Sequence, residues 1–193
     1  RAVTAEDFEW LAKESSNSVA RVCALPTQDK EGQVSILVVP KVAESHADFM
    51  AKPLASTELL RTVRNYLADR KLLTTVLNVQ RPVFRELSVV VEIILLQAIH
   101  ADRVKREIED KVRLFVHPLK GGKRGQGWPF GRAVYRVDLY HVVEAVSGVD
   151  FVDRVRIISE ETKQEVDQFK LLEGELVHCV NVEIIEKAHD RIM

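Results

Sequence analysis

"LSVVVEIIL", residues 87–95, is the stretch that decides the fold of the second half of the chain. Apolar residues occupy its alternate positions, and Ser88 and Glu92 fall between them. A period of two is typical of a β-strand with one fully buried side. The apolar run is also far too short to cross a bilayer. We therefore expect a long strand with these residues in a hydrophobic core: Leu87, Val89, Val91, Ile93 and Leu95.

Helices and further strands are expected on both sides of this strand. Helical spacing of apolar residues, with Thr4 and Asp102 as capping residues, predicts helices over residues 5–14, 56–70, 103–117 and 139–146. Pro118 ends the third helix and Gly148 the fourth. Runs rich in β-branched residues predict strands over residues 19–25, 33–40, 72–79, 149–158 and 175–185. The first two of these strands are separated by the polar turn "PTQDKEG", residues 26–32, so we expect a hairpin there.

The order of these elements indicates the fold class. It reads αββαβ and then βααββ, an irregular alternation that includes hairpins. Such an order favours an α+β fold with mainly antiparallel sheets and helices packed on one face. We expect two small mixed α/β layers, a subdomain at residues 1–81 and another at residues 82–193, divided near Arg81 and Pro82.

Composition excludes several classes of protein. The 193 residues are 46% hydrophobic and 30% charged, as in a globular rather than a disordered chain. With 28 cations against 29 anions, no overall field draws the chain to nucleic acid or to anionic lipid. Cys23 and Cys179 lie in apolar runs and suit buried thiols in a reducing compartment. No signal peptide opens the chain, and Arg1 in place of Met predicts a piece of a longer polypeptide.

One loop is unusually rich in glycine. "GGKRGQGWPFGR", residues 121–132, contains five of the chain's eight glycines. A P-loop requires Ser or Thr after its lysine, but Arg124 follows Lys123. The later glycines are spaced one residue too far apart for a dinucleotide-binding fingerprint, and a helix rather than a strand precedes them. We expect no cofactor here, and interpret the loop as a turn that glycines permit and that Pro129 stiffens.

The same region is basic. No acidic residue occurs between Asp110 and Asp138, and Trp128 and Phe130 could stack on bases. A nucleic-acid-binding module using the basic aromatic loop at residues 120–136 is therefore the alternative function. The basic residues of this region are Lys111, Arg113, Lys120, Lys123, Arg124, Arg132 and Arg136. Against this alternative, the whole chain is neutral, and Lys111 and Arg113 have acidic partners four residues earlier in their helix.

No group of residues predicts catalysis or metal binding. Glu175 and His178 form an E-x-x-H pair, but on a strand this spacing places them on opposite faces. Cys23 has no histidine nearby in the sequence, so a core thiol is favoured over a nucleophile. There is no nucleophile elbow and no kinase or hydrolase signature. We expect no catalytic residue, no metal and no enzymatic activity; a small hydrolase or transferase is a distant third hypothesis.

Four segments together resemble a known family. They are "RAVTAEDFEWLAKES" (1–15), "VARVCALP" (19–26), "FVHPLKGGKRGQGWPFGR" (115–132) and "VVEAVSGVDFVDRVRI" (142–157). They look like the C-terminal region of baseplate J-like proteins, the baseplate wedge subunits of contractile phage tails and extracellular contractile injection systems. The likeness covers most of residues 1–160, and "GWPFGR" and the spaced valines after Gly148 are its most specific parts. Ser18 departs from the pattern, because a glycine is expected before "VARV".

The resemblance implies a structural protein of virion assembly and no reaction. Such wedge subunits associate with one another and with neighbouring wedge proteins in a baseplate ring around the tail hub, and rearrangement of the ring releases sheath contraction. It also implies assembly in the bacterial cytoplasm and a place in the baseplate of a phage tail or injection particle. Neither a membrane nor a small-molecule substrate is implied, and nucleic acid is not the expected partner.

The glycine loop is the expected place of contact with a partner. The interface candidates are Lys123, Arg124, Trp128, Phe130 and Arg132. A second interpretation remains open for the two aromatic residues. Trp128 and Phe130 could instead bury their rings and close the hydrophobic core beneath the loop.

Overall fold

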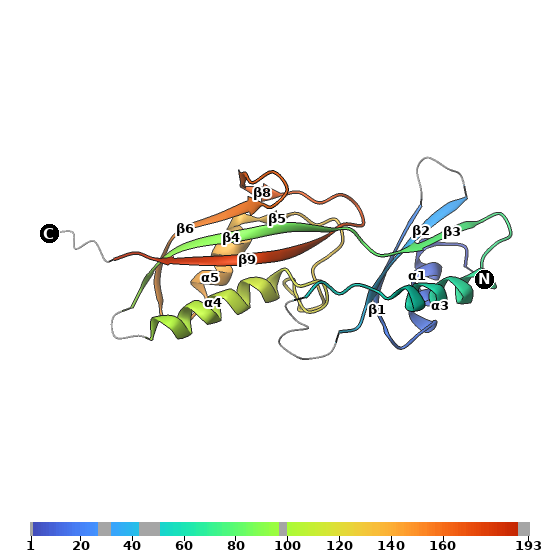
Figure 1. The fold of residues 1–193 in the computed structure, drawn as a ribbon, viewed down its shortest axis with the longest axis horizontal. Coiled ribbons are helices and arrows are strands. Elements are labelled where there is room, and N and C mark those ends of the chain that lie inside the picture. Colours follow the sequence, from blue (N-terminus) through green and yellow to red (C-terminus); the bar gives the residue numbers. More distant parts are fainter. Residues whose placement is uncertain (1, 27–31, 43–50, 97–99, 189–193) are drawn as a thin grey trace. The chain divides into compact units, whose positions relative to one another are not determined.

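A computed structural model describes residues 2–26, 32–42, 51–96 and 100–188 (Figure 1). It divides the chain into two compact units, Arg1–Val83 and Phe84–Met193. Helices and mainly antiparallel strand pairs occur in the described residues, so the expected α+β fold is confirmed. The two units are described separately below.

The first unit packs two helices on a three-stranded sheet. The helices are α1 (Ala5–Glu14) and α3 (Thr57–Ala68), and the strands are β1 (Val19–Pro26), β2 (Gln33–Pro40) and β3 (Val76–Gln80). β1 and β2 pair antiparallel, which confirms the predicted hairpin, although residues 27–31 of its turn lie outside the described residues. β3 pairs with β2 in parallel. The expected cap of α1 is also present, because Thr4 and Asp7 form a reciprocal capping box.

The strand expected over residues 72–79 is only half correct. β3 begins at Val76, and the residues before it form a turn in which the Thr75 amide donates to the Leu72 carbonyl at 3.0 Å. Lys71 donates to the Thr75 carbonyl at 2.6 Å and stabilises the same turn. Leu73 is fully exposed, so the apolar and β-branched residues before Val76 do not mark buried strand.

The second unit is built on a four-stranded sheet in the order β7-β6-β4-β9. β4 (Phe84–Leu95) lies between β6 (Val149–Ser159), which is antiparallel to it, and β9 (Leu176–Glu186), which is parallel. The predicted strand at residues 87–95 is thus the inner part of a longer one. β7 (Glu165–Val166) extends the sheet beside β6, while β5 (Val134–Tyr135) and β8 (Gln168–Phe169) form a separate short pair.

One face of this sheet carries the core of the second unit. All five residues of β4 that were expected inside are buried, four of them completely. The apolar stripes of α4 (Ala101–Phe115) and α5 (Arg136–Glu144) pack against them. These stripes are Val104, Ile108 and Val112 in α4, and Leu139 and Val143 in α5. Both helices therefore cover the same face, and the other face of the sheet is left to charged and mixed side chains.

The start of α4 differs from the prediction. His100 is the N-cap, without a side-chain hydrogen bond, and Asp102 lies inside the first turn. There its carboxylate favours the positive end of the helix dipole without capping the helix. Its backbone carbonyl, rather than its carboxylate, accepts from Arg106 at 3.2 Å. The two pairs expected along the helix are present as ion pairs: Lys111–Glu107 at 3.0 Å and Arg113–Glu109 at 3.0 Å.

Ile93 and Ile94 test which face of β4 supports the second unit. Ile93 is completely buried among the helices, whereas Ile94 points to the other face and is only partly buried. Ile93→Ala should lower the free energy of unfolding by about 2–5 kcal/mol, because it removes buried methyl groups and leaves a cavity. Ile94→Ala, the matched control, should cost less than half as much. Urea unfolding followed by Trp128 fluorescence, in a Trp10→Phe background, measures both; equal losses would contradict the assignment of faces.

Candidate interaction site at the glycine loop

The glycine loop, residues 121–132, lies in the longer segment of residues 116–133 that connects α4 to β5, and His117 organises this segment. The imidazole Nδ1 accepts from the amides of Leu119 at 3.1 Å and Lys120 at 3.2 Å. The backbone carbonyl of the same residue accepts from the amides of Gly121 at 2.8 Å and Trp128 at 2.9 Å. His117 therefore links the first turn of the segment to the backbone of Trp128, near the end of the loop. Because Nδ1 is an acceptor, the ring is neutral with its proton on Nε2.

The glycines allow backbone to pack directly on backbone. A Cβ placed on Gly121 would lie 2.5 Å from the carbonyl oxygens of both Phe115 and His117, so no side chain fits there. The next amide, of Gly122, donates to the Phe115 carbonyl at 2.7 Å, and Gly127 donates to the Gly121 carbonyl at 2.9 Å. Gly122 has a φ of 76°, in the left-handed region that favours glycine. The loop is therefore held by close main-chain contacts.

Trp128 anchors the loop from inside the core. It is 1% exposed, and its ring packs edge-on against Phe115 with the centroids 5.2 Å apart. The indole Nε1 donates to the Arg132 carbonyl at 2.9 Å. Of the two interpretations of the aromatic residues, Trp128 thus follows the one in which the ring closes the core. It reaches neither a base nor a partner surface in this conformation. Phe130 is half-buried at the loop surface.

The three basic interface candidates lie around one hollow. Lys123 and Arg124 are exposed and Arg132 is half-buried. All three line the hollow together with glycine backbone and two further side chains. Its lining residues are Gly121, Gly122, Lys123, Arg124, Gln126, Gly127, Pro129 and Arg132. The structure therefore brings these cations together and places Phe130 outside that set.

Four of the seven cations of the basic region have acidic partners among the described residues. Beyond the two pairs within α4, Arg136 pairs with Asp167 at 2.8 Å and Lys123 with Asp138 at 3.3 Å. Arg113 also donates to the carbonyls of Cys179 at 2.7 Å and Val180 at 3.2 Å, on β9. The basic run between Asp110 and Asp138 therefore forms no continuous positive stripe of the kind that follows a nucleic-acid backbone. The acidic partner of Lys123 lies in α5 and that of Arg136 lies between β7 and β8, whereas those of Lys111 and Arg113 lie in α4 itself.

Cys179 and Glu175 have environments that suit a structural role. Burial raises the pKa of the Cys179 thiol to about 12, which leaves it an unreactive core residue. The Glu175 carboxylate accepts from the Leu172 amide at 2.8 Å and lies 3.5 Å from Arg85. Within the described residues, no three His, Cys, Asp or Glu side chains gather as a metal site would require. No helix in that part of the chain is long and apolar enough to cross a membrane.

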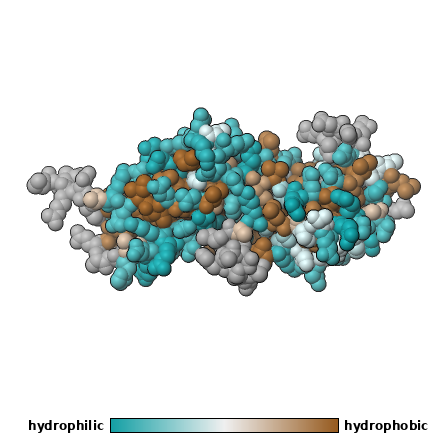
Figure 2. Space-filling view, viewed as in Figure 1, coloured by the Kyte–Doolittle hydropathy of each residue, from teal (hydrophilic) through white to brown (hydrophobic). Residues whose placement is uncertain are grey.

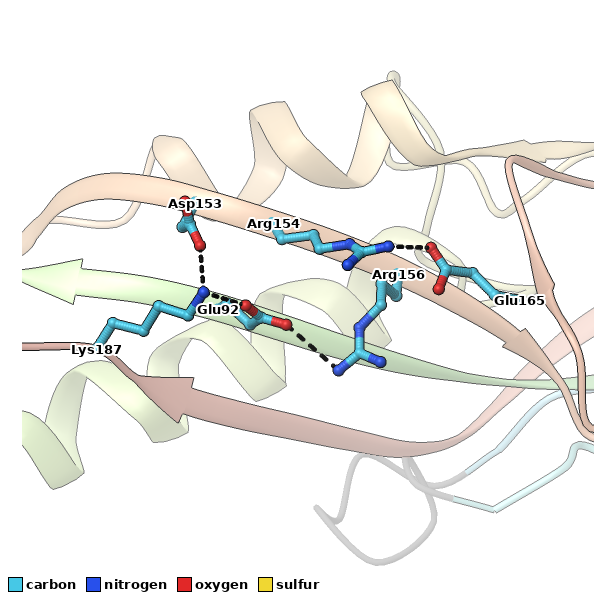
Figure 3. A network of polar contacts seen from close by, with 6 residues as sticks. All are labelled: Glu92, Asp153, Arg154, Arg156, Glu165 and Lys187. Atoms are coloured by element: carbon cyan, nitrogen blue, oxygen red, sulfur yellow. Dashed lines mark hydrogen bonds and ion pairs between the residues drawn. The ribbon is translucent and has the colours of Figure 1, made fainter.

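A second polar surface lies on the face of the sheet opposite α4 and α5. Figure 3 shows its six charged residues: Glu92, Asp153, Arg154, Arg156, Glu165 and Lys187. At its centre, Glu92 pairs with Lys187 at 2.5 Å and with Arg156 at 3.3 Å, and Lys187 also pairs with Asp153 at 2.5 Å. The Lys187 hydrogen bond lowers the pKa of Glu92, while Asp153 and then Glu92 raise that of Lys187. Sequence reasoning placed Glu92 on this face but missed its partners, which come from β6 and from the end of β9.

Hydrophobic surface accompanies this network. Figure 2 shows it over the strands of the second unit, bordered by hydrophilic residues. By the register of β4 and β6, Val90, Ile94, Phe151 and Ile158 point to this face. Phe151 is 52% exposed, which is a large exposure for an aromatic residue of a strand. The open face of the sheet thus combines apolar side chains with charges that are already paired.

Comparison with known proteins finds a similar fold among solved structures. No protein-family model and no curated protein matches the chain. Among solved structures, the chain is similar to a chain of the "Cryo-EM structure of the anti-feeding prophage (AFP) baseplate, 6-fold symmetrised", with a TM-score of 0.60 and 16% sequence identity. The match covers 95% of this chain and 38% of that chain. At this identity the likeness shows a shared fold.

Gly121 tests the packing of the loop. Gly121→Ala should lower the free energy of unfolding of the second unit by about 3 kcal/mol, because the new Cβ forces two carbonyl oxygens apart. Gly125→Ala is the control, since its Cβ would make only an ordinary contact with the Lys120 carbonyl oxygen at 3.9 Å and would cost the strain of a positive φ, about 1–2 kcal/mol. Urea unfolding followed by Trp128 fluorescence compares them. A smaller loss for Gly121→Ala than for Gly125→Ala would refute the close packing.

His117 makes the stability of the loop depend on pH. Burial, followed by the charges of Lys120 and His178, lowers the pKa of its imidazole from 6.5 to about 4. Between these values the unfolded chain binds a proton that the folded chain does not, so the contribution is complete above pH 6.5 and is lost as pH falls. The free energy of unfolding should drop by about 2 kcal/mol more between pH 7 and pH 5 than in His117→Asn. Asparagine keeps an acceptor but does not titrate.

Chemical unfolding at the two pH values, again followed by Trp128, measures this difference. The two proteins differ only at residue 117, so the comparison isolates the contribution of that side chain. An equal pH dependence for the wild type and His117→Asn would show that His117 is not held neutral by the fold.

Proposed function

We propose that the chain is a structural component of the baseplate of a contractile, phage-tail-like particle, and that it catalyses no reaction. One observation carries the proposal: the fold extends over 95% of the chain, at a TM-score of 0.60, onto part of a protein in the anti-feeding prophage baseplate structure. The J-like motifs in the sequence point to the same assembly independently. They include "GWPFGR", the segment around the buried Trp128.

The surfaces of the second unit suit a role in assembly. The glycine loop presents charged side chains on a backbone held by main-chain contacts, so its shape is set before a partner arrives. The open face of the sheet combines exposed apolar residues with paired charges, a mixture found at protein interfaces. A protein that acts through such surfaces needs no nucleophile and no metal.

The finer assignment within the baseplate is to the wedge. We propose a J-like wedge subunit, assembled in the bacterial cytoplasm, that associates with copies of itself and with neighbouring wedge proteins in a ring. Interfaces of this kind hold in one state and repack in another when an assembly switches. The resemblance of residues 1–160 to such subunits supports this assignment.

Deletion of the encoding gene tests the proposed function. Electron micrographs of the mutant should show sheath and tube without baseplates, or no assembled particles, and the gene supplied in trans should restore intact particles. A fluorescent or gold label on the C-terminus should locate the protein in the ring around the tube end. Intact particles with normal baseplates in the deletion strain would reject the proposal.

The position of the label tests the wedge assignment separately. A label in the ring supports the wedge, whereas a label confined to the sheath or to the central spike would contradict it even if the deletion abolishes baseplates.

A further inference from the structure

The hollow of the glycine loop has the size and lining of a binding site. It encloses about 450 Å³, within the range of small ligand sites. Lys123, Arg124 and Arg132 stand around it, and backbone of the glycines forms part of its wall. Because the main chain there is held by hydrogen bonds, the three cations project from a fixed backbone around one hollow.

The charge of this hollow is not neutralised by the described residues. Arg124 has no ion pair or hydrogen bond there, and the Arg132 guanidinium contacts only the Trp128 ring, 5.3 Å from its centroid. Lys123 alone has an acidic partner, Asp138. Elsewhere in the second unit, most cations are engaged in ion pairs, including those of the open sheet face. Two guanidinium groups that share one hollow without a carboxylate are therefore unusual in this unit.

The chemistry of the hollow favours carboxylates. A guanidinium group binds a carboxylate or a phosphate through parallel hydrogen bonds, and two of them can hold two neighbouring anionic groups. A nucleic acid would need an exposed ring for stacking and a longer positive track, but Trp128 is buried and Arg113 and Arg136, on either side of the loop, are paired with acidic residues. A short segment of protein with adjacent acidic side chains fits the three cations without either requirement.

We propose that this hollow binds an acidic segment of a partner protein, with Arg124 and Arg132 holding its carboxylates. Lys123 exchanges Asp138 for a carboxylate of the partner, so an internal ion pair opens when the partner binds. The inference deepens the proposed function and rests on it only for taking the partner from the same baseplate.

Binding of an acidic peptide by the full chain tests the hollow. A fluorescein-labelled hexaglutamate peptide should bind at low ionic strength, with its anisotropy rising as the protein is added. Replacing both arginines, Arg124→Gln with Arg132→Gln, should weaken binding at least about tenfold, because charge-assisted hydrogen bonds are lost. Far-ultraviolet circular dichroism and a urea-unfolding midpoint that match those of the wild type verify that the variant is folded.

A matched control separates the hollow from overall charge. Arg103→Gln with Lys170→Gln removes the same charge from exposed cations of the second unit that have no ion pair among the described residues. This variant should bind as the wild type does. Equal weakening in the two variants, or no binding by the wild type, would overturn the inference. So would tighter binding of an oligothymidylate of equal charge that is lost only in the hollow variant, since that result assigns the hollow to nucleic acid.

The exchange of Lys123 gives a second measurement. Asp138→Asn frees Lys123 and should tighten peptide binding severalfold. Glu144→Gln removes a negative charge from the same helix without touching Lys123 and should leave the affinity nearly unchanged. If both variants tighten binding equally, Lys123 does not change partners and this part of the inference is wrong.

These outcomes are independent of the proposed function. Peptide binding is measured on the isolated chain, whereas the baseplate role is measured in the deletion strain. Loss of baseplates together with absent peptide binding would reject only the proposed binding of an acidic segment by the hollow. Normal baseplates together with specific peptide binding would reject only the proposed baseplate role.

Discussion

Strand β4 is the element on which the second unit depends. It pairs with β6 on one side and with β9 on the other, and its inward residues lie beneath both helices of the unit. Because side chains alternate across a strand, a shift of one residue would move Leu87, Val89 and their successors to the open face and bring Glu92 into the core. Burial of this one face thus holds the register of the sheet and the positions of α4 and α5. It also directs the charged network and the exposed apolar residues to the opposite side.

The glycine loop depends in turn on the end of α4. Helix α4 stops before Pro118, and His117 uses both its ring and its carbonyl to fold the following chain back on the helix end. Gly121 fits only because it has no side chain, and Trp128 seals the loop against the core. The surface that results is rigid at its base and cationic at its rim. A contact residue and a packing residue can therefore be neighbours in this loop while having opposite roles.

Charge distinguishes the two candidate surfaces of the second unit. On the open sheet face, Glu92, Lys187 and Asp153 satisfy one another, so a partner there would meet a neutral and partly apolar surface. At the glycine loop, Arg124 and Arg132 keep their charge available. Paired charges contribute mainly to specificity and register in an interface, whereas unpaired cations attract an acidic partner directly. The two surfaces therefore suit partners of different charge.

Local patterns in the sequence determined the helices, the long strands and the hairpin. Alternation in β4, the helical stripe of α4 and the capping residue Thr4 each depend on residues a few positions apart, which is why they could be predicted. The short strands β5, β7 and β8 and the parallel pairing of β9 with β4 could not, because they depend on contacts between distant segments. The turn at residues 72–75 is local, and it was missed because its apolar and β-branched residues resemble a strand.

The candidate site divides in the same way. The sequence by itself located the glycine loop and its cations. Only the tertiary structure decided that Trp128 is core, that Lys123 meets Asp138, and that Arg124 and Arg132 have no acidic partner among the described residues. Burial and charge pairing depend on which residues the fold brings together.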